Sequence, residues 1–137
     1  MTPFVIYDAA AQAAFTPSKP FLIVAERVTL DWFFDKTAGV STAKVEWFLE
    51  FTSDDPLSVA ARWAREVAEE DIGNGVTHMP PVVRDFADIP TGQTKRSTQF
   101  VRSHQFVRVQ IKLALTSPDL LQRVTVQTPF GSQVLVP

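Results

Sequence analysis

The amino-acid sequence predicts an all-β fold, namely an antiparallel two-sheet β-sandwich with about seven or eight strands. Apolar and polar residues alternate in four long segments, turn-forming residues separate the segments, and no sustained amphipathic helix pattern is present apart from one contested segment. Antiparallel sheets with one solvated face alternate in this way, whereas buried parallel strands are continuously apolar. A chain of 137 residues with this many strands must form two packed sheets or a barrel.

Each of the four segments places apolar side chains at every second position, which turns them toward one face of a strand. The segments are 27–35, 44–52, 106–116 and 120–128. Turn residues lie between strands at 37–39, 53–56, 73–75, 91–93, 117–119 and 129–131. The stretch 76–99 is the least regular part of the sequence.

The segment 57–71 fits two conformations. Asp55 and Pro56 are a recognised helix start, and alanines follow them. Against a helix, four acidic residues crowd its C-terminal end, where the helix dipole disfavours negative charge. Alternation from Val59 to Val67 favours a strand, which is the conformation predicted here.

Residues 1–20 form an N-terminal arm or a first strand, and residues 21–137 form a single β-sandwich domain. The first segment carries Phe4 and Tyr7 and then an alanine-rich link. We expect it to be tied down, either in the chain's own sheet or on a neighbouring subunit.

Two phenylalanines break the strand pattern. Phe33 and Phe48 lie on the otherwise polar faces of their strands, whereas Trp32 and Trp47 fall on the apolar faces. A second buried layer is therefore expected over these polar faces, made by a loop, by the N-terminal arm or by a partner subunit.

Composition excludes several classes of protein. The chain has no Cys, which excludes disulfides, thiolate zinc sites and a cysteine nucleophile, and it shows neither a signal peptide nor a membrane-length apolar run. Residues 1–94 carry a net charge of −7 and residues 95–137 a net charge of +5. We expect these charges to pair across strands or subunits, with Glu46 and Glu50 facing Arg108 and Lys112, rather than to bind nucleic acid.

Catalytic and metal sites have little support. His78 and His104 lack neighbours at ligand spacing, and no nucleophile elbow or phosphate loop is present. The acidic clusters 54–55 and 69–71 are a weak calcium signal. Asp31 with Glu46 or Glu50 is a weak glycosidase-type pair. We therefore expect no enzymatic activity, no metal and no cofactor.

A resemblance adds to this interpretation. The segment 45–55, a strand running into a Ser-Asp turn, is followed by 62–66 and later by 99–102 and 106–112. This pattern resembles the small jelly-roll-like structural proteins of tailed-bacteriophage virions, over roughly residues 20–128. The late strand is also similar to that of carbohydrate-binding and discoidin-type sandwiches.

The resemblance implies a non-enzymatic virion protein, a capsid-decoration or head-fibre subunit that contacts the major capsid or other virion proteins. It also implies an oligomer of identical chains, and a closed trimer is plausible by symmetry. The candidate interface residues are Phe4, Tyr7, Phe33 and Phe48. The alternative is a carbohydrate-binding module of a receptor-binding fibre, which predicts an exposed aromatic side chain beside amide or acid groups.

Overall fold

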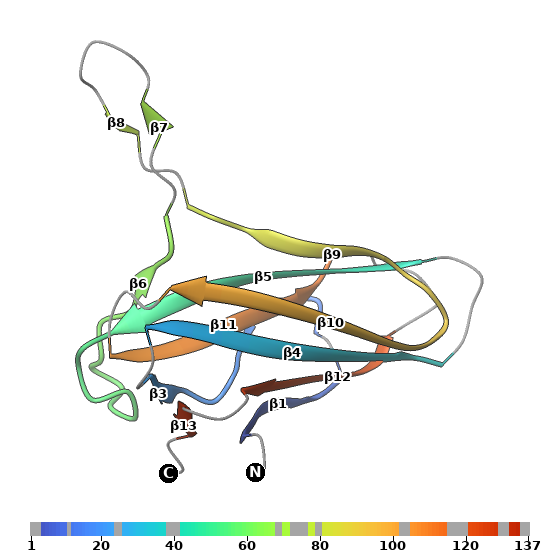
Figure 1. Cartoon of the computed structure of the whole chain (residues 1–137), viewed down its shortest axis with the longest axis horizontal. Coiled ribbons are helices and arrows are strands. Elements are labelled where there is room, and N and C mark those ends of the chain that lie inside the picture. The colour runs from blue at the N-terminus through green and yellow to red at the C-terminus, as the bar shows by residue number, and fades with distance from the viewer. Residues whose placement is uncertain are drawn as a thin grey trace.

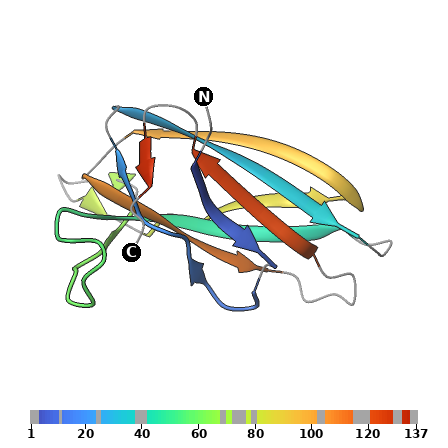
Figure 2. The same ribbon diagram turned by 90° about the horizontal axis from the view of Figure 1, so that it is seen from below.

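The computed structural model describes residues 4–10, 12–23, 26–37, 42–67, 70–71, 77–78, 81–101, 105–114, 121–128 and 132–134. Within these ranges every regular element is a β-strand, and no helix is long and apolar enough to cross a membrane. Figure 1 shows two antiparallel sheets packed face to face, and Figure 2 shows the same layers turned by a quarter rotation.

One sheet has four strands. In spatial order they are β1 (Phe4–Ala9), β12 (Leu121–Thr128), β4 (Arg27–Lys36) and β10 (Gly92–Val101). The N-terminal segment is thus a strand of the chain's own sheet, because β1 pairs with β12 from Phe4 opposite Thr128 to Ala9 opposite Val124.

The second sheet has seven strands. Its main order is β13 (Ser132–Val134), β3 (Phe21–Ile23), β11 (Phe106–Leu113), β5 (Ala43–Thr52) and β6 (Ala64–Arg65). Two further strands join it, β2 (Thr16–Pro17) beside β11 and β9 (Arg84–Ile89) beside β5. A separate pair, β7 (Glu70–Asp71) and β8 (Thr77–His78), stands clear of both sheets in Figure 1.

Eight strands carry jelly-roll connectivity. In chain order they are β1, β3, β4, β5, β9, β10, β11 and β12, and the first pairs with the eighth, the second with the seventh, the third with the sixth and the fourth with the fifth. This nested pairing is that of a long hairpin rolled up so that successive pairs alternate between two sheets. The predicted jelly-roll-like sandwich is confirmed.

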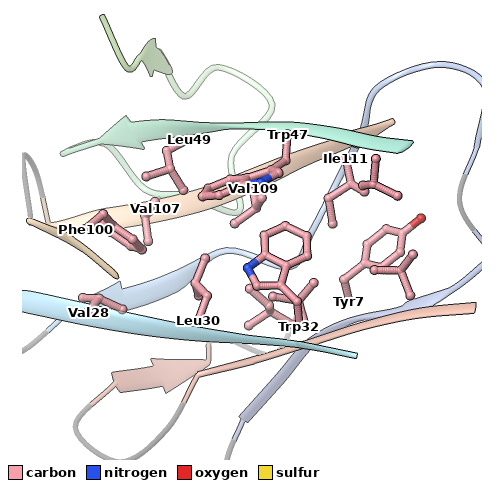
Figure 3. Packing of buried hydrophobic residues seen from close by; sticks show 14 of the residues in the cluster. Tyr7, Val28, Leu30, Trp32, Trp47, Leu49, Phe100, Val107, Val109 and Ile111 are labelled. Carbon is pink, nitrogen blue, oxygen red and sulfur yellow. The ribbon is translucent and has the colours of Figure 1, made fainter. Parts of the chain in front are cut away.

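The core lies between the two sheets and consists of the inward-facing members of each alternating pattern. Figure 3 shows Trp32 and Leu30 of β4 facing Trp47 and Val109 of the opposite sheet. The Trp32 and Trp47 ring centroids are 4.9 Å apart, and Phe86 packs against both indoles. The predicted placement of both tryptophans in the core is therefore confirmed.

The four segments predicted from alternation are strands, with ends that differ by a few residues and with 115–120 outside the described residues. The segment 57–71 is neither a helix nor one continuous strand. Turns occupy 56–60, and only the short strands β6 and β7 follow, so the predicted long strand is wrong. Side chains alternate as predicted only from Ala61 to Arg65, because Val59 lies fully exposed in the turns.

Candidate functional site

The outer face of the four-stranded sheet carries a shallow hollow of about 380 Å³. Outward-facing side chains of three neighbouring strands line it, because Phe33 of β4 lies opposite Lys95 of β10 and Thr125 of β12 in the strand register. The lining includes Phe33, Asp35, Gln93, Lys95, Arg123 and Thr125.

Phe33 is the apolar centre of this hollow. Its side chain is 36% exposed, and the Lys95 ammonium lies 5.5 Å from the ring centroid, within the range of a cation–π contact. At the β1 side, Arg123 is ion-paired with Asp8, and the Thr125 hydroxyl donates to the same carboxylate at 3.1 Å. The hollow therefore combines one accessible aromatic face with amide, carboxylate, hydroxyl and cationic groups.

The four candidate interface residues divide into two pairs. Phe4 and Phe33 are exposed on the four-stranded sheet, whereas Tyr7 and Phe48 are each only 7% exposed. Burial raises the pKa of Tyr7, and its hydroxyl donates to the carbonyl of Ala10 at 3.2 Å. Tyr7 and Phe48 therefore pack within the chain, and Phe4 and Phe33 are the two that a partner can reach.

Phe48 has the expected covering layer, and the chain itself supplies it. The Phe15 ring packs edge-on at 4.8 Å between centroids, and the Arg65 guanidinium lies 3.8 Å from the centroid of Phe48. Phe15 immediately precedes β2, and Arg65 belongs to β6, so the N-terminal segment and the short strand β6 both cover this outer face.

The predicted pairing of charges across strands is present on the same face. Arg108 lies opposite Glu50 in the register, and its Nε donates to the carboxylate at 2.9 Å. Trp63 lies 4.2 Å from the Arg108 guanidinium, and Gln110 donates to the same carboxylate at 2.7 Å. At this position the acidic part of the chain and its basic part therefore pair within one molecule.

The loop between β5 and β6 is a second exposed feature, and it is held by its own hydrogen bonds. The Asp54 carboxylate accepts the backbone N–H of Arg62 at 2.9 Å, and the Asp55 carboxylate accepts that of Leu57 at 3.0 Å. The Ser58 hydroxyl accepts the N–H of Ala60 at 3.1 Å. Leu57 and Val59 are nevertheless exposed at its tip, so the loop, named here the 54–62 loop, is internally hydrogen-bonded and presents an apolar tip.

Removing the Asp54 carboxylate is expected to loosen this loop. Its hydrogen bonds with the Arg62 backbone and side chain lower the pKa of Asp54, so their stabilising effect is full above the ordinary aspartate pKa and is lost as the pH falls through the lowered value. We expect amide hydrogen exchange at Arg62 to be several-fold faster in Asp54→Ala. Asp85→Ala, which removes an exposed partner of Lys44 outside the loop, is the control and should leave Arg62 exchange unchanged; equal effects would contradict the assignment.

The predicted acid pair is not formed. Asp31 lies on β4 and accepts a hydrogen bond from Ser97 at 2.8 Å, whereas Glu46 and Glu50 lie on β5 of the other sheet. Their polar strand faces point outward on opposite sides of the sandwich, so the glycosidase-type hypothesis is wrong for these residues. Among the described residues no cluster of His, Asp or Glu could hold a metal ion. His104 and 73–75 lie outside them, as does the side chain of His78.

Sequence reasoning found Phe33 but missed its neighbours. Gln93 and Lys95 belong to β10, which was not predicted as a strand, and Leu57 and Val59 belong to the segment predicted as β. A signal for the loop was present in the sequence, since two apolar residues follow Asp-Asp-Pro in a turn-forming stretch.

Comparison with known proteins gives distant similarities. No family model and no curated protein matches the chain. The surface-associated copper-binding protein CorA of Methylomicrobium album BG8 aligns over 93% of this chain and 92% of its own, at 9% identity and a TM-score of 0.42. A structure of infectious bursal disease virus, Gt strain, aligns over 97% of this chain and 39% of its own, at 11% identity and a TM-score of 0.22. The fold assignment therefore stands on the strand pairing itself.

Proposed function

We propose that the chain is a non-enzymatic structural subunit of a bacteriophage virion, of the capsid-decoration or head-fibre kind. It assembles through protein–protein contacts with copies of itself and with other virion proteins, including the major capsid protein. The jelly-roll connectivity and the sequence resemblance described above support this proposal, and the observation that carries it is the free-standing hairpin of β7 and β8.

That hairpin is placed for contact with another protein. A two-stranded hairpin is marginally stable by itself in water, yet this one stands away from both sheets (Figure 1). Its base is fixed, because Val67 pairs with Pro81 and the Arg84 guanidinium makes two hydrogen bonds to the Glu66 carboxylate, at 2.8 and 3.2 Å. A neighbouring molecule that covers this hairpin would stabilise it, which supports a subunit that assembles with other proteins.

Light scattering across a dilution series tests the proposal. We expect a constant mass of a trimer or a larger closed assembly for the intact chain. A variant in which a short turn replaces 68–80 should fold with an unchanged melting temperature, because the bridge between Val67 and Pro81 closes the cut, and should lose assembly. A strict monomer at all concentrations would overturn the self-assembling subunit.

A second candidate function is carbohydrate binding at the hollow around Phe33. The observation that favours it is an exposed aromatic ring beside Asp35 and Gln93, since aromatic faces stack on sugars while amide and acid groups bind hydroxyls.

Calorimetric titration with a panel of oligosaccharides tests this second function. Phe33→Ala should weaken any binding at least tenfold. Phe4→Ala, a similarly exposed phenylalanine of the same sheet, should leave it unchanged. Absence of heat with every oligosaccharide, or an equal effect of the two variants, would count against a sugar site at Phe33.

A further inference from the structure

The 54–62 loop and the hollow around Phe33 are complementary features at opposite ends of the sandwich. The loop follows the end of β5, whereas the hollow lies near the end of β4, where the chain turns toward the start of β5. Figures 1 and 2 both place these strand ends apart. A strand rises about 3.3 Å per residue, so the two features are on the order of 20 Å apart along the strands. One chain cannot bring them together.

The loop has the properties of a pre-organised docking element. Three backbone N–H groups within it donate to its own side chains, so little conformational entropy remains to be lost on binding. Its tip nevertheless presents Leu57, about half exposed, and Val59, fully exposed. Exposed apolar side chains on an ordered loop gain free energy only when another surface covers them.

The hollow has room for such a tip and carries a cationic group at its rim. A volume of about 380 Å³ accepts one or two aliphatic side chains against the Phe33 ring. Its rim carries Lys95, and the loop carries Asp55. Among the described residues neither of these two groups belongs to an ion pair. Docking would therefore place the Asp55 carboxylate beside the Lys95 ammonium group, which favours one orientation of the contact.

We propose that the tip of the 54–62 loop of one copy docks into the Phe33 hollow of the next copy. The inference rests on the proposed function, of which it names one contact. Because the two surfaces differ and lie at opposite ends, the contact is head-to-tail. Such contacts close into a ring when the rotation permits and otherwise continue as a chain. A sugar in the hollow and a docked loop would exclude each other.

Thiol crosslinking between two variants tests the contact, because the natural sequence has no Cys and each variant carries one thiol. We would mix Val59→Cys with Gln93→Cys, which lies in the hollow, and treat the pair with a short bis-maleimide. The matched control is Gln99→Cys, another exposed glutamine of β10 on the same face, six residues farther along the strand. We expect Val59→Cys to crosslink to Gln93→Cys at least tenfold more than to Gln99→Cys.

A charge at the tip provides the second measurement. Val59→Glu in the intact chain should lower the assembled mass or weaken the assembly at least tenfold, whereas Val101→Glu, at an exposed valine of β10, should not. Equal crosslinking to the two glutamine positions, or no crosslinking, would overturn the contact. If the crosslinking result were negative but the assembled mass stayed constant on dilution, the docking contact would be overturned and the structural-subunit proposal would stand. A strict monomer would overturn both.

Discussion

Replacing Trp32 with alanine is expected to lower the free energy of unfolding by about 3–5 kcal/mol. The side chain is fully buried, its ring lies 4.9 Å from that of Trp47, and its indole N–H donates to the Thr98 hydroxyl at 3.0 Å. Truncation leaves a cavity between the sheets and removes the donor to Thr98. Since domains of this size are stable by about 5–15 kcal/mol, the variant should lose a large share of its stability.

Urea unfolding followed by circular dichroism measures this loss without relying on the removed fluorophore. Trp63→Ala is the control, because Trp63 is half-buried outside the core and stacks on Arg108. We expect Trp63→Ala to cost about 1 kcal/mol, the scale of an exposed cation–π contact. Equal losses in the free energy of unfolding for the two variants would contradict the central position of Trp32 in the core.

Replacing Phe48 with alanine is expected to cost about 3 kcal/mol, and the cost should not depend on protein concentration. Phe48 is covered by Phe15 and Arg65 of its own chain. Its loss therefore exposes a gap within one molecule. An interface phenylalanine would behave differently, because its contribution to stability would fall as the assembly is diluted.

The matched control for Phe48→Ala is Phe33→Ala, the other phenylalanine on a polar strand face. It is 36% exposed and packs only against Lys95 among the ring contacts of the described residues. In the unassembled chain we expect Phe33→Ala to change the free energy of unfolding by less than about 1 kcal/mol, whereas in the assembly it should also weaken the docking contact at the hollow. A loss for Phe48→Ala that appears only on dilution would place Phe48 between subunits and contradict the intrachain layer.

The predictable part of the fold is the part with one buried and one solvated face. The alternating segments that became β4, β5, β11 and β12 lie inside their sheets, where burial on one side imposes a period of two. The predicted pairing of Glu50 with Arg108 follows from the same cause, because opposite charges on the polar faces of adjacent strands lie within reach.

Strand β10 was missed because it lies at a sheet edge. Among the described strands it pairs only with β4, and Phe100 is its one buried residue. Edge strands are commonly polar and charged, which prevents pairing with other chains, and Lys95 and Arg96 fit that rule. A strand of this kind has no apolar period to detect, so Gln93 and Lys95, the neighbours of Phe33 on β10, were not predictable from local pattern.

The two phenylalanines on polar faces show what pattern alone leaves open. Phe33 and Phe48 carry the same signal in the sequence, yet one is open to solvent and the other is covered by segments from two other parts of the chain. The covering depends on the paths of the N-terminal segment and of β6, which only the tertiary structure specifies. Likewise, alternation in 57–71 predicted a strand, but local hydrogen bonds to Asp54, Asp55 and Ser58 stabilise turns instead.

The position of β12 has a consequence for the order of folding. This strand is the last of the eight in the chain, yet it lies between β1 and β4. During synthesis β1 and one edge of β4, whose other edge pairs with β10, therefore stay unpaired until residues 121–128 have left the ribosome. Until then the four-stranded sheet lacks the strand between β1 and β4, and the facing edges of these two strands carry unpaired N–H and C=O groups. A strand from another nascent copy can fill this position by donor-strand exchange. We therefore expect copies translated side by side on one message to form some strand-swapped dimers, and more of them when the last segment is released slowly.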